Sequence, residues 1–242
     1  MENPFISVVI PAFNEQDRIG DTVTGIMAYL DQKQFTWEIL VIDDGSNDKT
    51  YQVIDEISSG TEASVNVLSI QHGGKGWAVK NGMLAARGEY RFMADADMAM
   101  PVGQLDRFLK FIEEGYDIVI GSRQMAGSRR FSEPRSRHIM GRIFNWIVQI
   151  FAIKGFQDTQ CGFKCFNAKT AEILFGLLHT KGFGFDVELL YLANKLNLSV
   201  LEMPIDWYHQ KSSKVRPVQD SILMVKDILG IRVRDLFGFY SY

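Results

Sequence analysis

The sequence has only two cysteines, Cys161 and Cys165, among 242 residues. Two are too few for a disulfide framework, and the pair has no nearby histidine or cysteine to complete a zinc site. We interpret both cysteines as reduced and mostly buried. No basic stretch followed by an apolar one occurs at residues 1–4, so we expect no signal peptide.

Long apolar runs and an excess of one charge are also missing. No run reaches the ~18–20 apolar residues of a membrane-spanning helix. Hydrophobic residues make up 46% of the sequence, which is ordinary for a globular protein. The net charge is −3, so the molecule as a whole lacks the positive charge that is typical of nucleic-acid-binding proteins. Without an internal repeat or a low-complexity linker, this length predicts one large domain.

Two common nucleotide-binding patterns are absent. Residues 73–76 are rich in glycine, but no Ser or Thr follows a Gly-Lys pair in the frame of a kinase or ATPase phosphate loop. No GxGxxG follows a predicted strand, which argues against a dinucleotide-dependent dehydrogenase. Because the glycine-rich turn opens a predicted helix, its backbone amides are expected to face an anion.

Short apolar runs alternate with segments of helical spacing in the first half. We predict strands at 6–10, 38–42, 65–70, 90–94 and 117–120, and helices at 18–30, 48–57, 77–86 and 104–113. This alternation predicts an α/β fold with a doubly wound, mostly parallel sheet. Such sheets bind ligands at the carboxyl ends of their strands, where this chain has its polar clusters.

The second half has a different character. It reads as a basic loop at 121–137, an apolar stretch at 139–153, a strand at 162–167, a helix at 186–196, a strand at 200–203 and a helix at 219–237. Residues 121–154 contain seven Lys or Arg and one acid, a net charge of +6. A basic region on an acidic chain predicts a small anionic ligand or an anionic surface.

Asp95-Ala96-Asp97 stands at the end of the fourth predicted strand. In an extended chain, residues i and i+2 project to the same side, so both carboxylates are able to hold one hard divalent cation. A solvated turn or helix cap is the alternative. Asp43-Asp44 likewise suits a ribose hydroxyl or base edge, or only a turn capped by Asp48.

Four segments together resemble the inverting family-2 glycosyltransferases, which have a Rossmann-like GT-A fold. They are Pro11-Ala12-Phe13-Asn14-Glu15, Asp43-Asp44-Gly45-Ser46, Lys75-Gly76 and Asp95-Ala96-Asp97. The resemblance implies one catalytic domain, with residues 1–125 as the half that binds the nucleotide sugar and 126–242 as the acceptor half with a helical extension. It implies that the donor-binding residues are Pro11, Ala12, Asn14, Glu15, Asp43, Asp44, Lys75, Asp95 and Ala96. Asp95 and Asp97 would hold Mg²⁺ or Mn²⁺ against the diphosphate, which makes Asp97 a catalytic residue.

Four further segments are similar to dolichyl-phosphate glucosyltransferases and polyprenyl-phosphate mannosyltransferases. They are Gly121-Ser122-Arg123, residues 155–164, Phe185-Asp186-Val187-Glu188 and Ser213-Lys214-Val215. The Gln-Cys-Gly-Phe-Lys run resembles the glucosyl branch, and Ala99 stands where mannosyl enzymes often have an amide. This resemblance implies UDP-glucose as the favoured donor and a polyprenyl or dolichyl phosphate as the acceptor. The eukaryotic glucosyl enzymes carry an N-terminal membrane helix, and the sequence has no apolar run of that kind.

Three basic residues, Arg123, Arg137 and Lys214, are candidates to clamp the acceptor phosphate, with a solvated surface role as the alternative. We expect Arg123 and Asp158 to be catalytic, Asp158 as a general base or by orienting the acceptor. The alternative for Asp158 is a loop carboxylate that caps backbone amides. Asp186 and Glu188 are expected to pair with cations.

Residues 143–153 and the predicted helix at 219–237 combine apolar side chains with basic neighbours. This composition favours the surface of a membrane, and we expect a cytoplasmic protein bound to its inner face. Burial in the core or in a homo-oligomer contact is nearly as well supported. Two other functions stay open: transfer to a glycan or soluble hydroxyl, and nucleotide-sugar binding without catalysis. The QxxRW motif of processive synthases is absent.

Overall fold

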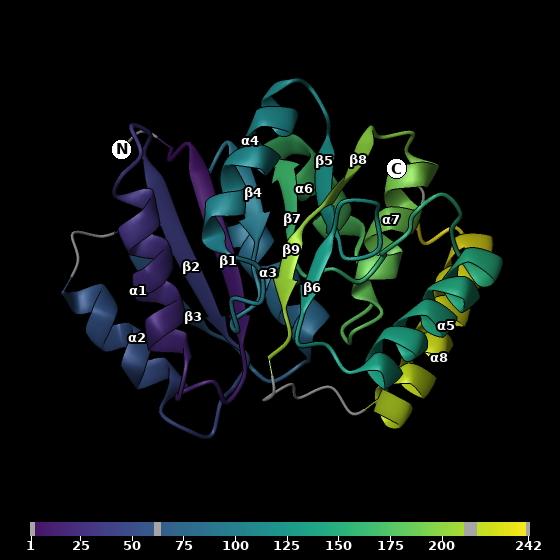
Figure 1. Cartoon of the computed structure of the whole chain (residues 1–242), viewed down its shortest axis with the longest axis horizontal. Coiled ribbons are helices and arrows are strands. Elements are labelled where there is room, and N and C mark those ends of the chain that lie inside the picture. Colours follow the sequence, from purple (N-terminus) through teal and green to yellow (C-terminus); the bar gives the residue numbers. More distant parts are fainter. Residues whose placement is uncertain (1–2, 61–63, 211–216, 241–242) are drawn as a thin grey trace.

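A computed structural model describes residues 3–60, 64–210 and 217–240, with the side chains of 135–137 and 217–220 left undescribed (Figure 1). Its centre is a seven-stranded sheet in the order β3-β2-β1-β4-β7-β5-β8. The strands are β1 (Ile6–Ala12), β2 (Trp37–Asp43), β3 (Val65–Ser69), β4 (Tyr90–Met93), β5 (Ile118–Ser122), β7 (Lys164–Asn167) and β8 (Val200–Pro204). Only β7 runs antiparallel to its neighbours β4 and β5, so the predicted mostly parallel sheet is confirmed.

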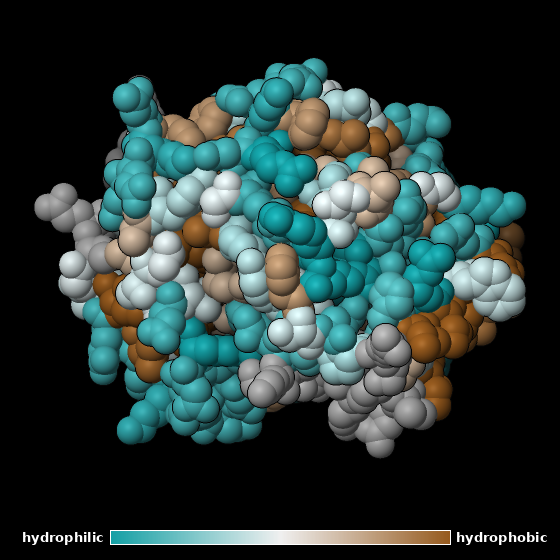
Figure 2. Space-filling model, in the orientation of Figure 1, coloured by the Kyte–Doolittle hydropathy of each residue, from teal (hydrophilic) through white to brown (hydrophobic). Residues whose placement is uncertain are grey.

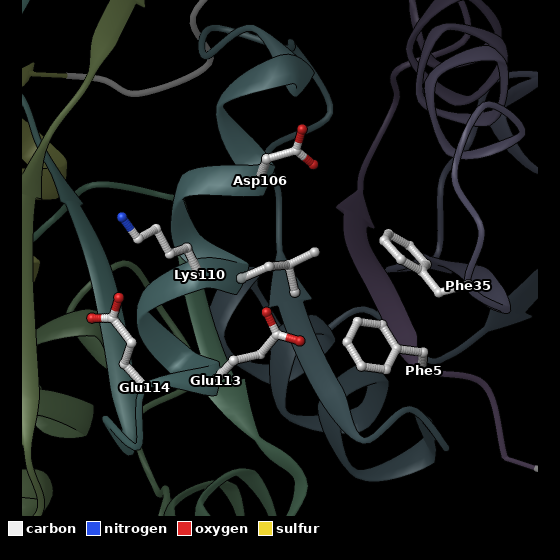
Figure 3. A pocket seen from close by; sticks show the side chains of 7 residues that line it. Phe5, Phe35, Asp106, Lys110, Glu113 and Glu114 are labelled. Atoms are coloured by element: carbon white, nitrogen blue, oxygen red, sulfur yellow. The ribbon is translucent and has the colours of Figure 1, made fainter.

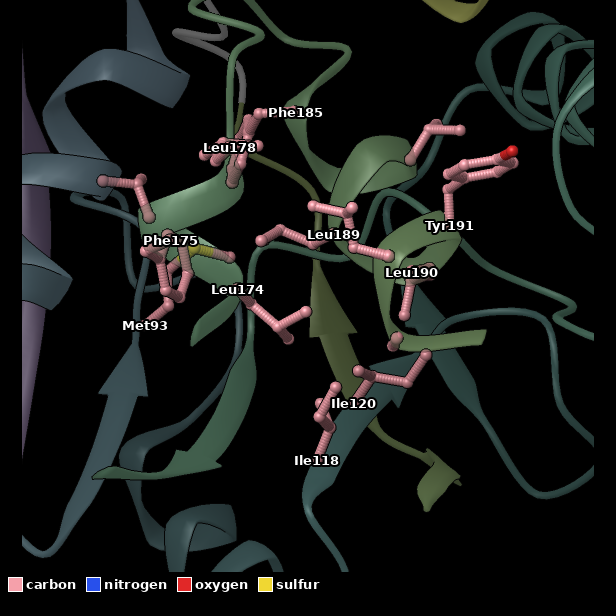
Figure 4. Packing of buried hydrophobic residues seen from close by; sticks show 14 of the residues in the cluster. Met93, Ile118, Ile120, Leu174, Phe175, Leu178, Phe185, Leu189, Leu190 and Tyr191 are labelled. Carbon is pink, nitrogen blue, oxygen red and sulfur yellow. The ribbon is translucent and has the colours of Figure 1, made fainter. Parts of the chain in front are cut away.

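Helices cover both faces of the sheet (Figure 1). One buried cluster joins it to α1 (Ile19–Leu30), α2 (Thr50–Ser59) and α4 (Leu105–Glu113). The other joins it to α3 (Lys75–Ala85), α5 (Arg135–Phe151), α6 (Ala168–Leu177), α7 (Phe185–Lys195) and α8 (Pro217–Leu236). In the second cluster, Leu174, Leu189 and Leu190 meet Ile118 and Ile120 of β5 (Figure 4). Burial on both faces explains why the strands read as unbroken apolar runs rather than alternating ones.

The two halves of the chain share this sheet. Strand β7 comes from the second half but lies between β4 and β5 of the first, and β8 pairs with β5. A separate two-stranded sheet joins β6 (Arg129–Phe131) to β9 (Asp206–Tyr208). The short 3-10 turn η1 (Val102–Gln104) leads into α4. The predicted acceptor half therefore shares one sheet with the predicted nucleotide-binding half.

Parts of the second half differ from the sequence prediction. The prediction of a structureless loop at 121–137 was wrong, because this segment contains β6 and the start of α5. Helix α6 and strand β9 were not predicted. Three-residue strands such as β6 and β9 are too short for a pattern of period two, and they form only because the two segments meet. Within the described residues, no helix has the length and apolar character needed to cross a membrane.

Candidate active site

The polar segments gather where the sheet changes its direction of winding. Strands β1 and β4 are neighbours, while the chain between them passes through β2 and β3 on one side. Asn14 and Glu15 follow β1, Asp43 ends β2, and Asp95 and Asp97 follow β4. In open α/β sheets, this switch point is where ligands bind.

Lys75 and Asp95 form the central ion pair of this site. The Lys75 ammonium Nζ lies 2.6 Å from Asp95 Oδ1. Burial lowers the pKa of Lys75, but the charges of Asp95 and Asp186 outweigh it and raise this pKa to about 12. Burial raises the pKa of the Asp95 carboxyl, but the charge and hydrogen bond of Lys75, together with the charges of Lys164 and Arg123, outweigh this effect and leave the pKa below its ordinary value. The site therefore holds a fixed cation beside a fixed carboxylate at neutral pH.

Asp97 is held by its own turn. Its Oδ1 accepts the Ala99 amide at 3.1 Å, and Met98 between them has a φ of +45°. The Thr22 hydroxyl on α1 donates to the Ala96 carbonyl at 2.8 Å and so fixes the middle of the motif. Burial and the charge of Asp95 raise the pKa of Asp97. The two carboxylates therefore repel each other, and a bound cation relieves this repulsion.

These two carboxylates fit a divalent cation that takes its remaining ligands from the substrate. Among the described residues, no cluster of three or more His, Cys, Asp or Glu is able to hold a metal. Mg²⁺ is commonly bound by one or two carboxylates together with phosphate oxygens and water. Asp95 and Asp97 supply that donor set, beside a lysine that suits the same phosphates.

The glycine-rich turn before α3 is built on Asp44. The Gly73 and Gly74 amides donate to the two Asp44 carboxylate oxygens at 2.8 and 2.9 Å. These amides therefore face an anion, as predicted, but the anion is a side chain of the protein itself. The Asp43 carboxylate accepts hydrogen bonds from the Ser46 amide at 3.1 Å and from the Ser69 hydroxyl at 3.3 Å. Asp44 thus ties the end of β2 to the turn that presents Lys75.

The segment after β1 lies against the loop that follows β2. The Asn14 amide donates to the Ser46 hydroxyl at 2.8 Å, and the Glu15 amide donates to Thr50 Oγ1 at 2.7 Å. The Glu15 carboxylate also pairs with Arg18, which the sequence analysis did not single out. Burial lowers the pKa of Arg18, but the hydrogen bond and charge of Glu15, with smaller contributions from Asp97 and Asp95, raise this pKa above its ordinary value. Arg18 therefore adds a further cation near the two carboxylates.

Arg123 and Asp158 form a two-point ion pair. Arg123 Nε and Nη2 donate to the two Asp158 oxygens at 2.7 and 2.8 Å, and the Arg123 amide donates at 2.9 Å. Burial alone would raise the pKa of Asp158, but Arg123 outweighs it and lowers this pKa. The same pair raises the pKa of Arg123 despite burial. A carboxylate with a lowered pKa is a weak base, so the geometry favours the orienting role for Asp158.

A second buried ion pair lies near the central one, because Lys164 acts on Asp95 and Lys75 acts on Asp186. Lys164 and Asp186 form an ion pair, and Lys164 also donates to the Cys161 carbonyl at 2.5 Å. Burial raises the pKa of Asp186 although Lys164 opposes it. Beside this pair, a Cβ added at Gly162 would lie 2.0 Å from Asp95 Oδ2, so any side chain at this position would displace the Asp95 carboxylate. The sequence predicted no role for Lys164 beyond its place in the Gln-Cys-Gly-Phe-Lys run, although a lysine within an apolar strand signals a buried partner.

The remaining predicted pairings of the second half have mixed outcomes. Asp186 forms an ion pair with Lys164, and Glu188 forms one with Arg234. The prediction that both carboxylates pair with basic side chains is confirmed. In the basic region, Arg129 pairs with Asp206 and Arg123 with Asp158, two acids from outside residues 121–154, so the local charge count overstates its positive field. The Arg137 side chain and Lys214 lie outside the described residues.

Both cysteines are free and buried, as predicted, and burial raises the pKa of Cys161 to about 12.

A surface groove elsewhere on the molecule is separate from this site. It lies between Phe5, Phe35 and the side chains of α4, including Asp106, Lys110 and Glu113 (Figure 3). Phe5 precedes β1, so the groove is at the amino end of that strand, whereas the ion pairs follow the carboxyl ends. It contains no part of the predicted donor or metal set.

Comparison with known proteins places this geometry in a class. Residues 7–172 match the glycosyl transferase family 2 profile, so the chain belongs to that family. Solved structures show the same GT-A-like fold. Mannosyl-3-phosphoglycerate synthase from Rubrobacter xylanophilus superposes with a TM-score of 0.69 at 20% identity, over 96% of this chain and 74% of that one. Glucosyl-3-phosphoglycerate synthase from Mycobacterium tuberculosis, solved with Mn²⁺ and UDP-glucose, gives 0.67 at 20% identity over 94% and 78%.

The sequence relatives are more similar to this chain than the solved structures are, and they carry one enzyme name. The dolichyl-phosphate beta-glucosyltransferase of Dictyostelium discoideum is 38% identical over 100% of this chain and 78% of that protein. The enzymes of the same name from Saccharomyces cerevisiae and Homo sapiens are 36% and 34% identical, over 99% and 96% of this chain and 77% and 76% of those proteins. This chain is therefore a family-2 glycosyltransferase similar to the dolichyl-phosphate beta-glucosyltransferases.

Proposed function

We propose that the protein is an inverting, metal-dependent enzyme that transfers glucose from UDP-glucose to a polyprenyl or dolichyl phosphate. The observation that carries this proposal is the meeting of Lys75 with Asp95 and Asp97 at the carboxyl edge of the sheet. A fixed cation beside two carboxylates suits a diphosphate that also binds a divalent cation. The names of the relatives supply the favoured sugar and acceptor.

On the donor side, Asp95 and Asp97 hold Mg²⁺ or Mn²⁺ against the diphosphate, and Lys75 contacts the same phosphates. When bound, the cation stabilises the negative charge that develops on the leaving nucleoside diphosphate. The nucleoside lies along the ends of β1 and β2. The residues proposed to contact it are Pro11, Ala12, Asn14, Glu15 and Asp43 there and Ala96 after β4, with Asp44 supporting the turn of Lys75.

On the acceptor side, transfer is a single displacement. An oxygen of the acceptor phosphate attacks the anomeric carbon, and the electron pair of the breaking C–O bond leaves with the nucleoside diphosphate. A phosphate monoester has a second pKa of about 6 and is largely dianionic at neutral pH, so it needs no general base. Arg123, oriented by Asp158, is proposed to hold this phosphate. Arg137 and Lys214 are proposed to assist from sequence alone.

A lipid acceptor requires contact with a membrane, and two helices suit this contact. On α5, the exposed apolar residues Ile139, Ile143, Trp146 and Ile150 follow helical spacing along one face. The solvent-exposed face of α8 likewise carries Ile222, Leu229, Val233 and Leu236. The two helices lie side by side at one end of the molecule, where hydrophobic surface gathers (Figures 1 and 2).

The charge of α5 favours a bilayer over a second copy of the chain. This helix has no acidic residue, and exposed Arg142 and Lys154 flank its apolar side chains. Basic groups beside an apolar helix face bind anionic lipid headgroups. We therefore propose that the protein works at the inner, cytoplasmic face of a membrane, with the α5/α8 face in the headgroup region.

A transfer assay that separates lipid from water-soluble products tests the proposed function. The protein is incubated with radiolabelled UDP-glucose, Mn²⁺ and a short-chain polyprenyl phosphate, and then extracted with organic solvent. Label in the organic phase supports the proposal. In a parallel incubation with glycan acceptors, label only in the water-soluble glycans would indicate a hydroxyl acceptor, and UDP binding by calorimetry without transfer to any acceptor would indicate a binding module. Both outcomes contradict a lipid phosphate acceptor.

A further inference from the structure

Glu188 is a buried hub that the proposed reaction does not use. It lies on α7 with no exposed surface. Its carboxylate accepts the His179 and Thr180 amides at 3.1 and 2.7 Å, and so holds the start of the loop at 179–184. Two groups from the C-terminal end of the chain donate to the same carboxylate: Tyr240 through its hydroxyl, and Arg234 of α8.

The C-terminal groups grip the loop at further points. Arg234 Nη2 donates to the Thr180 hydroxyl and Arg234 Nε donates to the Tyr240 hydroxyl, both at 2.9 Å. Tyr240 itself is 1% exposed. Farther along the loop, a Cβ added at Gly184 would lie 2.6 Å from the Cβ of Asp227, so α8 also packs directly on the loop. Residues of α8 and the segment after it therefore fix both ends of 179–184.

On its other side, the same loop supports the turn that carries Lys75. The Trp77 amide donates to the Lys181 carbonyl at 3.1 Å, and the Lys181 ammonium lies 4.8 Å from the centre of the Trp77 ring. At Gly76, an added Cβ would lie 2.6 Å from the Thr180 carbonyl oxygen. Backbone thus packs on backbone here, without a flexible side chain between them. A shift of the loop must therefore shift the first turn of α3, and with it Lys75.

We propose that Glu188, Arg234 and Tyr240 are positioning residues for the donor site, which act through loop 179–184 to set the place of Lys75. The proposal rests on the proposed function only for the role of Lys75 toward a nucleoside diphosphate. It also gives the apolar helix α8 a second role, because the element that lies nearest the membrane in the proposed function fixes the lysine that faces the donor. Loss of the Tyr240 hydroxyl should loosen loop and turn together.

Two tyrosine variants provide a matched test. Tyr240→Phe removes a hydroxyl that donates to Glu188, whereas Tyr191→Phe removes a hydroxyl that donates to Asp235 of the same helix α8. No hydrogen bond of Tyr191 reaches the described loop residues 179–184. Arg234→Gln is a second way to weaken the hub if Tyr240→Phe does not fold. The first measurement is amide hydrogen exchange in the full chain without ligand, compared for residues 73–78 and 179–184.

We expect Tyr240→Phe to accelerate exchange in both segments and Tyr191→Phe in neither. Titration of UDP with Mn²⁺ then links the turn to donor binding. The Kd for UDP and the KM for UDP-glucose should rise about two- to tenfold in Tyr240→Phe, the range expected for one hydrogen bond, with an unchanged KM for the acceptor. Faster exchange confined to 179–184, or equal effects of both variants, overturns the positioning role. Exchange decides that role without a nucleotide, whereas failure of the wild type to bind UDP would contradict the proposed function instead.

Discussion

Lys75 Nζ lies 2.6 Å from Asp95 Oδ1, so the lysine of the glycine-rich turn directly contacts the first carboxylate of the Asp-Ala-Asp motif. The two residues are 20 positions apart and come from different strand ends. This ion pair joins the two motifs in one proposed donor site. An arriving diphosphate would give Lys75 a second anion and leave both carboxylates for the divalent cation.

Because of this contact, we expect a substitution of Lys75 to weaken the binding of the nucleoside diphosphate directly. Lys75→Met should raise the Kd for UDP in the presence of Mn²⁺ by roughly 10- to 100-fold, because charged hydrogen bonds contribute about 1.5–3 kcal/mol. Calorimetric titration measures this change. Lys80→Met on the same helix α3 is the control, because Lys80 donates to the Gly176 and Leu178 carbonyls instead. Equal affinity in Lys75→Met and the wild type would refute the assignment.

Arg123 should affect the acceptor rather than the donor. Arg123→Ala is expected to raise the KM for the polyprenyl phosphate, or to lower kcat, while the Kd for UDP stays unchanged. Steady-state kinetics with each substrate varied in turn measures this split. Arg129→Ala is the matched control, because that exposed arginine pairs with Asp206 in the two-stranded sheet. An effect on UDP binding equal to that on the acceptor would place Arg123 elsewhere in the mechanism.

The Arg123–Asp158 pair also predicts how stability depends on acid. The folded pKa of Asp158 is below its ordinary value of 3.8, so its contribution is present above that value and lost as the pH falls through the folded pKa. Asp158→Asn should therefore lose less of its free energy of unfolding than the wild type between about pH 5 and pH 2. Urea unfolding at several pH values measures this slope. Asp55→Asn, at an exposed position on α2, should keep the wild-type slope.

The α5/α8 face should bind anionic vesicles. We expect the wild type to sediment with phosphatidylcholine vesicles that contain phosphatidylglycerol, and Trp146→Asp to stay mostly in the supernatant, because Trp146 on α5 is a large apolar side chain that is 64% exposed. Tyr51→Asp on α2, at the other end of the molecule, is the control (Figure 1). If light scattering instead shows a wild-type dimer that Trp146→Asp dissociates, the face is a contact between two copies.

Much of the first half could be predicted because its signals are local. Buried parallel strands appear as runs such as residues 6–10, and each helix between them has its own apolar spacing. The order of strands then places Asp95 and Asp97 near the glycine-rich turn without knowledge of any contact. The ordered set of motifs also identified the family, which the match over residues 7–172 confirms.

The contacts of the second half depend on partners far away in sequence. Asp206 neutralises Arg129 across 77 positions, and Asp158 binds Arg123 across 35, so a local count of charges could not foresee either pair. The Lys164–Asp186 pair is hidden for the same reason. Loop 179–184 carries no motif at all, and its importance becomes visible only where Thr180 and Lys181 touch the turn of Lys75.

The most direct test of the central claim compares a polyprenyl phosphate with the free polyprenol of the same chain length. With radiolabelled UDP-glucose and Mn²⁺, the wild type should label the phosphate and leave the alcohol unlabelled, because only the phosphate is a nucleophile without a general base. Asp97→Ala should label neither acceptor, whereas Asp106→Asn, in the separate groove beside α4, should behave as the wild type. Label in the free polyprenol, or full activity in Asp97→Ala, would contradict the account.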